Sequence, residues 1–251
     1  MSSVTTSMIV LACILGGVAL GMGLRRILPE QHRSSETKDV VKIGMGLVST
    51  MTALLLGLLV ASAKSAYDTK GGEISQMAAK MILLDRMLAQ YGPETAEIRT
   101  GLRQAVGRAI AQMWPDEGAA GPQLDPSAAS GEALYGRIEQ LKPETALQST
   151  CRSEALTLAR DVGATRWLLF SQKASSVSKP FLAVVVFWLT VLFLSYGLYA
   201  PFNFTSICAL VLCAVSVAGA LFLVMELDHP FRGVIQLSSE PLREAMSHIG
   251  K

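Results

Sequence analysis

Charged residues are scarce in this chain, and four long apolar stretches contain none of them before Glu226. Asp, Glu, Lys and Arg make up 17% of the 251 residues, whereas hydrophobic residues make up 51%. The four stretches are 4–24, 43–63, 181–200 and 205–226, and Glu226 is the last residue of the last one. Pumps and carriers that couple to protons keep ionisable side chains at membrane depth. The sequence therefore argues against that class of transporter.

Histidine is also rare, since the chain has only His32, His229 and His248. They are too far apart in sequence to form a local metal or catalytic motif, and the chain has no nucleophile elbow, phosphate-binding loop or paired zinc motif. We therefore expect no enzyme activity, no metal and no cofactor. Asp228 and His229 could act as an acid and a base, but before Pro230 a helix end with an ion pair is favoured.

The cysteines and the net charge exclude two further classes. Cys13, Cys208 and Cys213 lie in apolar stretches and Cys151 stands alone in the polar part, so the sequence indicates packing residues rather than a disulfide framework. The formal net charge is only +2, and basic residues are interleaved with acidic ones. Nucleic acid is therefore not an expected partner.

The longest apolar run, residues 181–227, is about twice the length that one crossing of a ~30 Å hydrocarbon core needs at about 1.5 Å per helical residue. Pro201 and Asn203 interrupt it near its middle, which predicts two crossings, 181–200 and 205–226, joined by a tight turn. Aromatic side chains are concentrated at this turn, as they are at bilayer interfaces: Tyr196, Tyr199, Phe202 and Phe204.

The other two apolar stretches predict a first crossing at 4–24 and a second at 43–63. Arg25 and Arg26 follow the first stretch in place of a small-residue cleavage site, so no cleavable signal peptide is expected. Small residues let helix backbones approach closely. The candidate helix-packing glycines are Gly16, Gly17, Gly21 and Gly57.

The second stretch is less apolar than the others, and Ser49, Thr52 and Leu56 would share one face of its helix. A face of hydroxyl groups and small residues can line a water-filled path, which makes these three the candidate pore-lining residues. The same hydroxyl groups can instead bond back to helix carbonyls or pack against other helices. Both interpretations remain open, with packing favoured.

Residues 64–179 have the composition of a helical domain outside the membrane. The stripe Ile74, Met77, Met81, Leu84 and Leu88 steps by three and four residues, as in a helix packed against another helix. Smaller features complete the prediction: a solvated connector at 25–42, a helix that stops at Tyr91, a mobile loop at 114–131, a long helix from Pro143 to about Ser178, and a polar tail at 227–251 with a short helix at 241–248.

The predicted fold class is therefore an all-α membrane protein with four transmembrane helices and a helical-bundle domain inserted between the second and third. Lys64 and Asp68 would leave the membrane at the same face as Glu226 and Asp228. We expect membrane-exit ion pairs among these four residues, with Lys64 close to Glu226 or Asp228. A partly exposed pair would contribute about 0–1 kcal/mol, so it would set register more than stability.

The positive charges favour one orientation. Nine basic residues flank the crossings on the side of the domain: Lys64, Lys70, Lys80, Arg160, Arg166, Lys173, Lys179, Arg232 and Arg243. Five flank them on the other side: Arg25, Arg26, Arg33, Lys38 and Lys42. Because basic residues are enriched on the cytoplasmic side, we expect the domain and both termini to be cytoplasmic.

Four segments, together with the order of the predicted elements, carry a resemblance to a known family. They are RRILPE at 25–30, LGLLVASAKSAYDTK at 56–70, MILLDRMLAQYGPE at 81–94 and LDHPFRG at 227–233. With them, the chain resembles the bestrophin-like domain proteins of bacteria, a family named for a distant similarity to bestrophin anion channels.

The resemblance implies a multi-pass protein of the bacterial inner membrane. It also implies a homo-oligomer, a pentamer if it is built like bestrophins, with small inorganic anions passing along an axial pore lined by the second crossing. Bestrophins follow their own Pro-Phe-Gly segment with acidic residues that bind calcium, whereas here Pro230 and Phe231 are followed by Arg232 and Gly233. Calcium gating is therefore not carried over. A passive anion channel is the expected function, and a non-conducting signalling or scaffold protein is the alternative.

Overall fold

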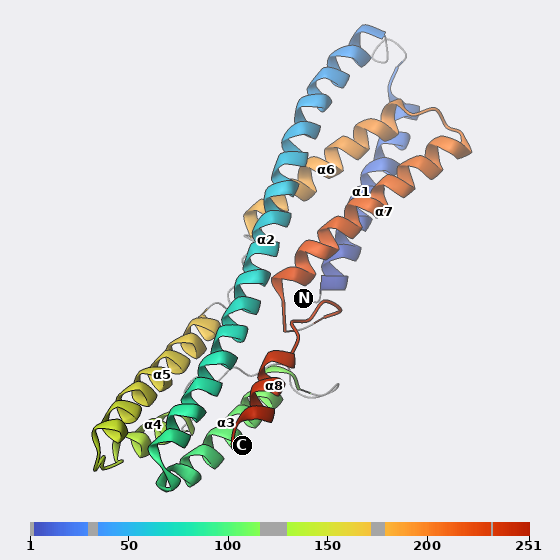
Figure 1. The fold of residues 1–251 in the computed structure, drawn as a ribbon. Coiled ribbons are helices and arrows are strands. Elements are labelled where there is room, and N and C mark those ends of the chain that lie inside the picture. Colours follow the sequence, from blue (N-terminus) through green and yellow to red (C-terminus); the bar gives the residue numbers. More distant parts are fainter. Residues whose placement is uncertain (1–2, 30–34, 116–129, 172–178, 232) are drawn as a thin grey trace. The chain divides into compact units, whose positions relative to one another are not determined.

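The computed structural model describes residues 3–29, 35–115, 130–171, 179–231 and 233–251, and most of these residues are in helices (Figure 1). They belong to two compact units, which we describe separately. The first unit lies within residues 1–66 and 176–229, and the second within 67–175 and 230–251. Helix α2 (Ser35–Tyr91) contributes to both.

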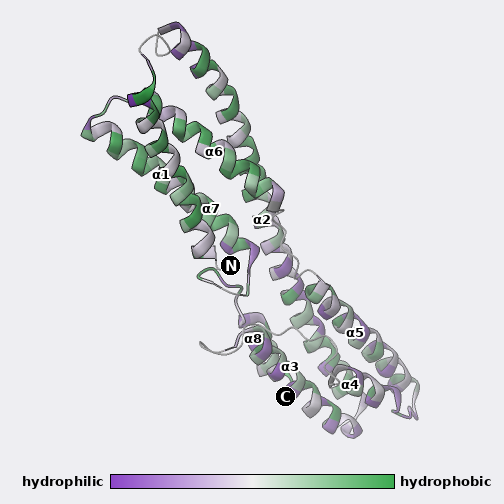
Figure 2. Ribbon diagram, turned by 180° about the vertical axis from the view of Figure 1, so that it is seen from behind, coloured by the Kyte–Doolittle hydropathy of each residue, from purple (hydrophilic) through white to green (hydrophobic). Residues whose placement is uncertain are grey.

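The first unit contains α1 (Ser3–Ile27), the first part of α2, α6 (Lys179–Tyr199) and α7 (Phe204–Asp228). Four helices, namely α1, α2, α6 and α7, are long and apolar enough to cross a membrane, and Figure 2 shows the hydrophobic character of α1, α6 and α7. A shared core joins all four and includes Ile14, Leu59, Phe193 and Leu221. The all-helical membrane fold is thus confirmed.

The turn between α6 and α7 has the predicted position. The α6 helix ends at Tyr199, and Asn203 caps α7 by accepting a hydrogen bond from the Ser206 backbone N–H at 2.8 Å. Arg25 of α1 donates a hydrogen bond to the Ala200 carbonyl, and the Arg26 guanidinium lies 5.6 Å from the centre of the Phe202 ring. The basic C-terminal end of α1 therefore contacts the turn between α6 and α7.

The predicted connector at 25–42 is wrong at both ends, because α1 continues to Ile27 and α2 already begins at Ser35. Arginine is a good helix former and its charge is favourable in the last turn of a helix, where Arg25 and Arg26 lie. The first turn of α2 similarly contains the acid Glu36, and no proline or glycine interrupts residues 35–42.

The second unit is a helical bundle built from the rest of α2, the 3₁₀ turn η2 (Pro93–Thr95), α3 (Ala96–Met113), α4 (Ser130–Glu139), α5 (Ala146–Ser171) and α8 (Glu240–His248). The predicted apolar stripe of α2 is confirmed as its core, since Ile74, Met77, Leu84 and Leu88 are at most 2% exposed. The Lys80 ammonium also lies 2.8 Å from an Asp161 carboxylate oxygen and joins α2 to α5.

The helix boundaries in this unit are mostly the predicted ones. The α2 helix ends at Tyr91, where Gly92 adopts a φ of 138° that suits glycine, and Pro93 opens the next turn. The short terminal helix is α8. The loop predicted at 114–131 falls mainly on residues 116–129, which are outside the described residues.

The predicted helix from Pro143 to about Ser178 begins later in the structure, because α5 starts at Ala146. Its predicted end lies outside the described residues, which stop at Ser171 in this segment. Thr145 and Gln148 form a reciprocal cap before it. The Gln148 N–H donates to the Thr145 hydroxyl at 3.1 Å, and the Thr145 N–H donates to the Gln148 side-chain oxygen at 3.3 Å. This is the capping box of a helix N-terminus, and it explains the start.

Candidate functional site

The membrane stretch of α2 is the least covered of the four candidate spans. Within the chain, 11% of its most apolar window is buried, against 22–33% in the other three. One face packs into the first unit through Thr52, Leu59 and Ala63, which are at most 6% exposed. The rest of the helix surface has no partner helix in the described part of the chain to cover it.

The three candidate pore-lining residues, Ser49, Thr52 and Leu56, lie on the packed side of α2. Thr52 is 4% exposed, and its hydroxyl donates to the Val48 carbonyl at 2.7 Å. Leu56 packs against the core of the first unit, and Ser49 lines a cavity beside α6 and α7. The structure brings the three onto one side, as the spacing implied, but this side faces the other helices of the same chain.

A second strip of α2, which the sequence analysis did not single out, is exposed. Gly46, Thr50, Ala53 and Gly57 follow one another at steps of four, three and four residues, so they share a face. All four are exposed, and a side chain added at Gly46 or Gly57 would meet nothing within 4 Å. The Thr50 hydroxyl donates to the Gly46 carbonyl at 3.0 Å. The side chains of the strip are small, uncharged and weakly polar.

Large apolar side chains border this strip on the side away from the packed face. Leu47, Leu54 and Leu58 are 62–71% exposed. Such an uninterrupted apolar surface needs lipid or another protein surface against it.

The candidate packing glycines divide into two groups. At Gly17, an added Cβ would lie 2.7 Å from the Thr190 carbonyl oxygen of α6, and at Gly21 it would overlap the Leu194 backbone. Gly197 of α6 makes the reciprocal approach to Val18 and was missed by sequence reasoning, although it too is a small residue in an apolar helix. Gly16 and Gly57 have open space at the corresponding position.

The acids predicted at the membrane exit are buried at the end of α7. Glu226 is 2% exposed and Asp228 is 4% exposed, whereas Lys64 and Asp68 are exposed on α2. The proximity of Lys64 to Glu226 or Asp228 stays a prediction. The sequence analysis predicted partly exposed carboxylates at this position, whereas both are buried in the structure. Buried carboxylates require polar partners.

His229 lies where α7 ends. Its ring Nδ1 is 3.9 Å from an Asp228 carboxylate oxygen and 3.1 Å from the Met225 carbonyl oxygen, and the backbone N–H of His229 donates to the Glu226 carbonyl. These contacts are those of a helix terminus. Among the described residues, no group of three or more His, Cys, Asp and Glu side chains is arranged to hold a metal ion.

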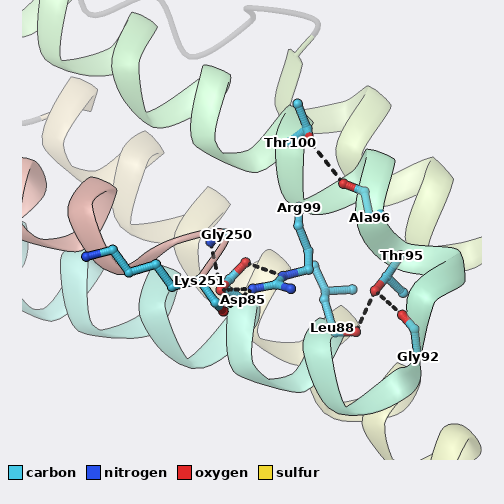
Figure 3. A network of polar contacts seen from close by, with 9 residues as sticks. All are labelled: Asp85, Leu88, Gly92, Thr95, Ala96, Arg99, Thr100, Gly250 and Lys251. Atoms are coloured by element: carbon cyan, nitrogen blue, oxygen red, sulfur yellow. Dashed lines mark hydrogen bonds and ion pairs between the residues drawn. The ribbon is translucent and has the colours of Figure 1, made fainter.

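A buried ion pair in the second unit was also missed (Figure 3). Asp85 of α2 is 2% exposed and accepts two hydrogen bonds from the Arg99 guanidinium of α3, at 2.8 and 2.9 Å. The Gly250 N–H donates to the same carboxylate at 3.2 Å, and Arg99 also donates to the Lys251 carbonyl. The hydrogen bond to Asp85 raises the pKa of Arg99, so the guanidinium stays charged.

The segment after α7 is fixed to the second unit by further polar contacts. The Trp114 indole N–H donates to the Leu237 carbonyl at 2.7 Å, and the Tyr67 hydroxyl donates to the Gln236 carbonyl at 3.2 Å. The Trp114 and Phe231 rings meet edge to face at 5.8 Å. Phe231 and residues 233–251 therefore form part of the bundle.

Comparison with known proteins gives one match. The family model of the bestrophin-like domain matches residues 12–242, which include all four candidate spans except the first residues of α1 and all of the helical unit except its last residues. Searches of the curated proteins and of the solved structures found no match. The chain is a membrane protein, and it belongs to the bestrophin-like domain family.

Proposed function

We propose that this protein is a homo-oligomeric, passive channel for small anions in the bacterial inner membrane, with α2 lining the path. The observation that carries the proposal is the low burial of α2: of the four candidate spans, it has the largest share of its surface left uncovered by its own chain. A helix in this position needs partners, and identical subunits around an axis would supply them. The family resemblance supports the same arrangement.

The lining is assigned to Thr50, Ala53 and Gly57 of the exposed strip, because its fourth member, Gly46, lines a cavity beside α6 and α7. Ser49, Thr52 and Leu56 were the first candidates, but the burial of Thr52 favours the packing explanation for them. Small side chains leave room near an axis, and the Thr50 hydroxyl gives the strip a polar group without a charge. The bordering leucines of the exposed surface would then pack against neighbouring subunits or lipid.

The orientation belongs to the same proposal. The second unit forms the helical domain inserted between the second and third crossings, and the excess of basic residues near it favours the cytoplasm. Its helices carry many hydrophilic residues among the hydrophobic ones, whereas α1, α6 and α7 of the first unit are mainly hydrophobic (Figure 2). No catalytic role is proposed.

Recording from purified protein in planar bilayers tests conduction. Gluconate replaces part of the chloride on one side of the bilayer. We then expect unitary currents that reverse near the chloride equilibrium potential, because the permeant ion is a small anion. Heat-denatured protein from the same preparation is the control. An absence of unitary currents in chloride, bromide and nitrate salts would contradict the proposal.

Counting subunits in detergent tests the assembly separately. Mass photometry and imaging are expected to give a closed ring, with five copies if the assembly follows bestrophins. A monomer or dimer would leave no axis for a pore.

A non-conducting signalling protein is the second candidate, and one observation favours it. The α2 helix runs without interruption for 57 residues, from a candidate span into the helical unit, so a shift of one part can be passed to the other. Crosslinking in cells would then recover a second protein with the helical unit, whereas recovery of homo-oligomers alone would weaken this candidate.

A further inference from the structure

A cavity of about 690 Å³ lies at one end of the first unit, between α2, α6 and α7. Its volume is within the range of small-molecule sites, which is about 300–1,000 Å³. Lys38, Lys42, Met45 and Ser49 line it from one face of α2, because they follow each other at helical spacing. Tyr196 and Tyr199 of α6 and Leu210 of α7 line the opposite side, so three different helices enclose the space.

The lining has one sign of charge. Lys38 and Lys42 are its only charged members among the described residues, and both ammonium groups belong to exposed side chains at the start of α2. Asp39 lies between them in sequence but does not line the cavity. The Tyr196 and Tyr199 rings and Ser206 add hydroxyl groups, while Val41, Met45 and Leu210 make much of the remaining wall apolar.

The position of the cavity along the helices places it at the membrane surface. Lys42 immediately precedes the uncharged stretch of α2, Tyr199 ends α6 and Ser206 lies in the first turn of α7. Lysine and tyrosine are both suited to this depth, where lysine attracts anionic lipid headgroups and the amphipathic tyrosine ring lies at headgroup level.

We propose that this cavity binds one anionic phospholipid, with the headgroup phosphate at Lys38 and Lys42 and an acyl chain against Val41, Met45 and Leu210. A free inorganic anion would gain nothing from the apolar wall, and a zwitterionic lipid would gain less from the two lysines because its own cationic group offsets the phosphate charge. The proposal does not depend on conduction and holds for a non-conducting protein as well.

Native mass spectrometry of the full chain tests this with two lipids, phosphatidylglycerol and phosphatidylcholine of identical acyl chains. Wild-type protein is expected to retain phosphatidylglycerol more strongly. Each lysine beside a bound acidic headgroup adds roughly fivefold in affinity for that lipid. Lys38→Gln and Lys42→Gln should each lower phosphatidylglycerol retention by about that factor, and the double variant by about 25-fold. Lys64→Gln, at the other end of the same membrane stretch, is the matched control and should change nothing.

A second pair of variants tests the shape of the cavity without changing its charge. Gly46 lines the cavity and Gly44 does not, and an added Cβ meets nothing within 4 Å at either position. Gly46→Phe should therefore fill the cavity and reduce phosphatidylglycerol retention at least fivefold, whereas Gly44→Phe should leave it unchanged.

Three results would overturn the proposal. Equal retention of the two lipids by wild-type protein would show that the two lysines do not select an anionic lipid. Equal effects of Gly46→Phe and Gly44→Phe would remove the role of the cavity. Displacement of phosphatidylglycerol by an equal concentration of inorganic phosphate would assign the site to a water-soluble anion instead.

Discussion

Asp85→Ala is expected to lower the free energy of unfolding by about 3 kcal/mol, because it leaves the Arg99 guanidinium without its carboxylate partner in a mostly buried position. The Asp85 side chain is 2% exposed and the Arg99 side chain is 19% exposed. The Gly250 N–H loses its acceptor in the same variant. For a chain of this size the loss corresponds to a melting temperature about 6–12 °C lower.

A double-mutant cycle separates the ion pair from the rest of the network. Asp85→Ala, Arg99→Ala and the double variant are compared by thermal melting in detergent, followed by tryptophan fluorescence. The double variant should cost less than the sum of the single ones, because each single variant leaves one member of the pair without its partner and the double variant leaves none. Arg103→Ala, an exposed arginine on the same helix, is the matched control. Equal melting temperatures for Asp85→Ala and Arg103→Ala would show that the pair contributes nothing.

Gly21→Leu is expected to disrupt the first unit. The Leu194 backbone of α6 occupies the space that any side chain at Gly21 needs, and a backbone cannot move aside as a flexible side chain can. Overpacking costs about 1–3 kcal/mol where neighbours can adjust, and we expect about 3 kcal/mol or more here. The measurement is the fraction of protein that elutes as one species in detergent, together with its melting temperature.

Gly23→Leu is the matched control for this experiment. Gly23 lies on the same helix, is exposed, and has open space where a Cβ would be added. It should behave like the parent protein. If Gly21→Leu and Gly23→Leu elute and melt alike, the close approach of α1 and α6 is not what holds the unit together.

Local patterns explain which parts of the fold were predictable. Helix ends at Tyr91 and Tyr199 follow from the glycine and proline residues next to them, and these act within a few residues. The core stripe of α2 follows from spacing alone. The start of α5 could also be predicted, because Thr145 and Gln148 have the capping-box spacing. The sequence analysis instead placed the helix start at the proline at position 143.

The features that the sequence did not predict depend on contacts between segments that are distant in the chain. Asp85 and Arg99 are on different helices, and nothing in either local pattern pairs them. Spacing placed Ser49, Thr52 and Leu56 on one face of α2, but only packing decides whether that face meets water, lipid or the same chain. Gly17 and Gly21 had a visible spacing, whereas their partner Gly197 could be recognised only once α1 and α6 were placed together.

The most direct test of an ion path along α2 is cysteine modification during bilayer recording. In a background with Cys13, Cys151, Cys208 and Cys213 replaced, Thr50→Cys or Thr52→Cys is introduced and a water-soluble anionic thiosulfonate is added. If the exposed strip lines the path, reagent reduces the current of Thr50→Cys and leaves that of Thr52→Cys unchanged, because Thr52 is buried in its own subunit. Unchanged current in both variants, or a reduction confined to Thr52→Cys, would contradict this placement.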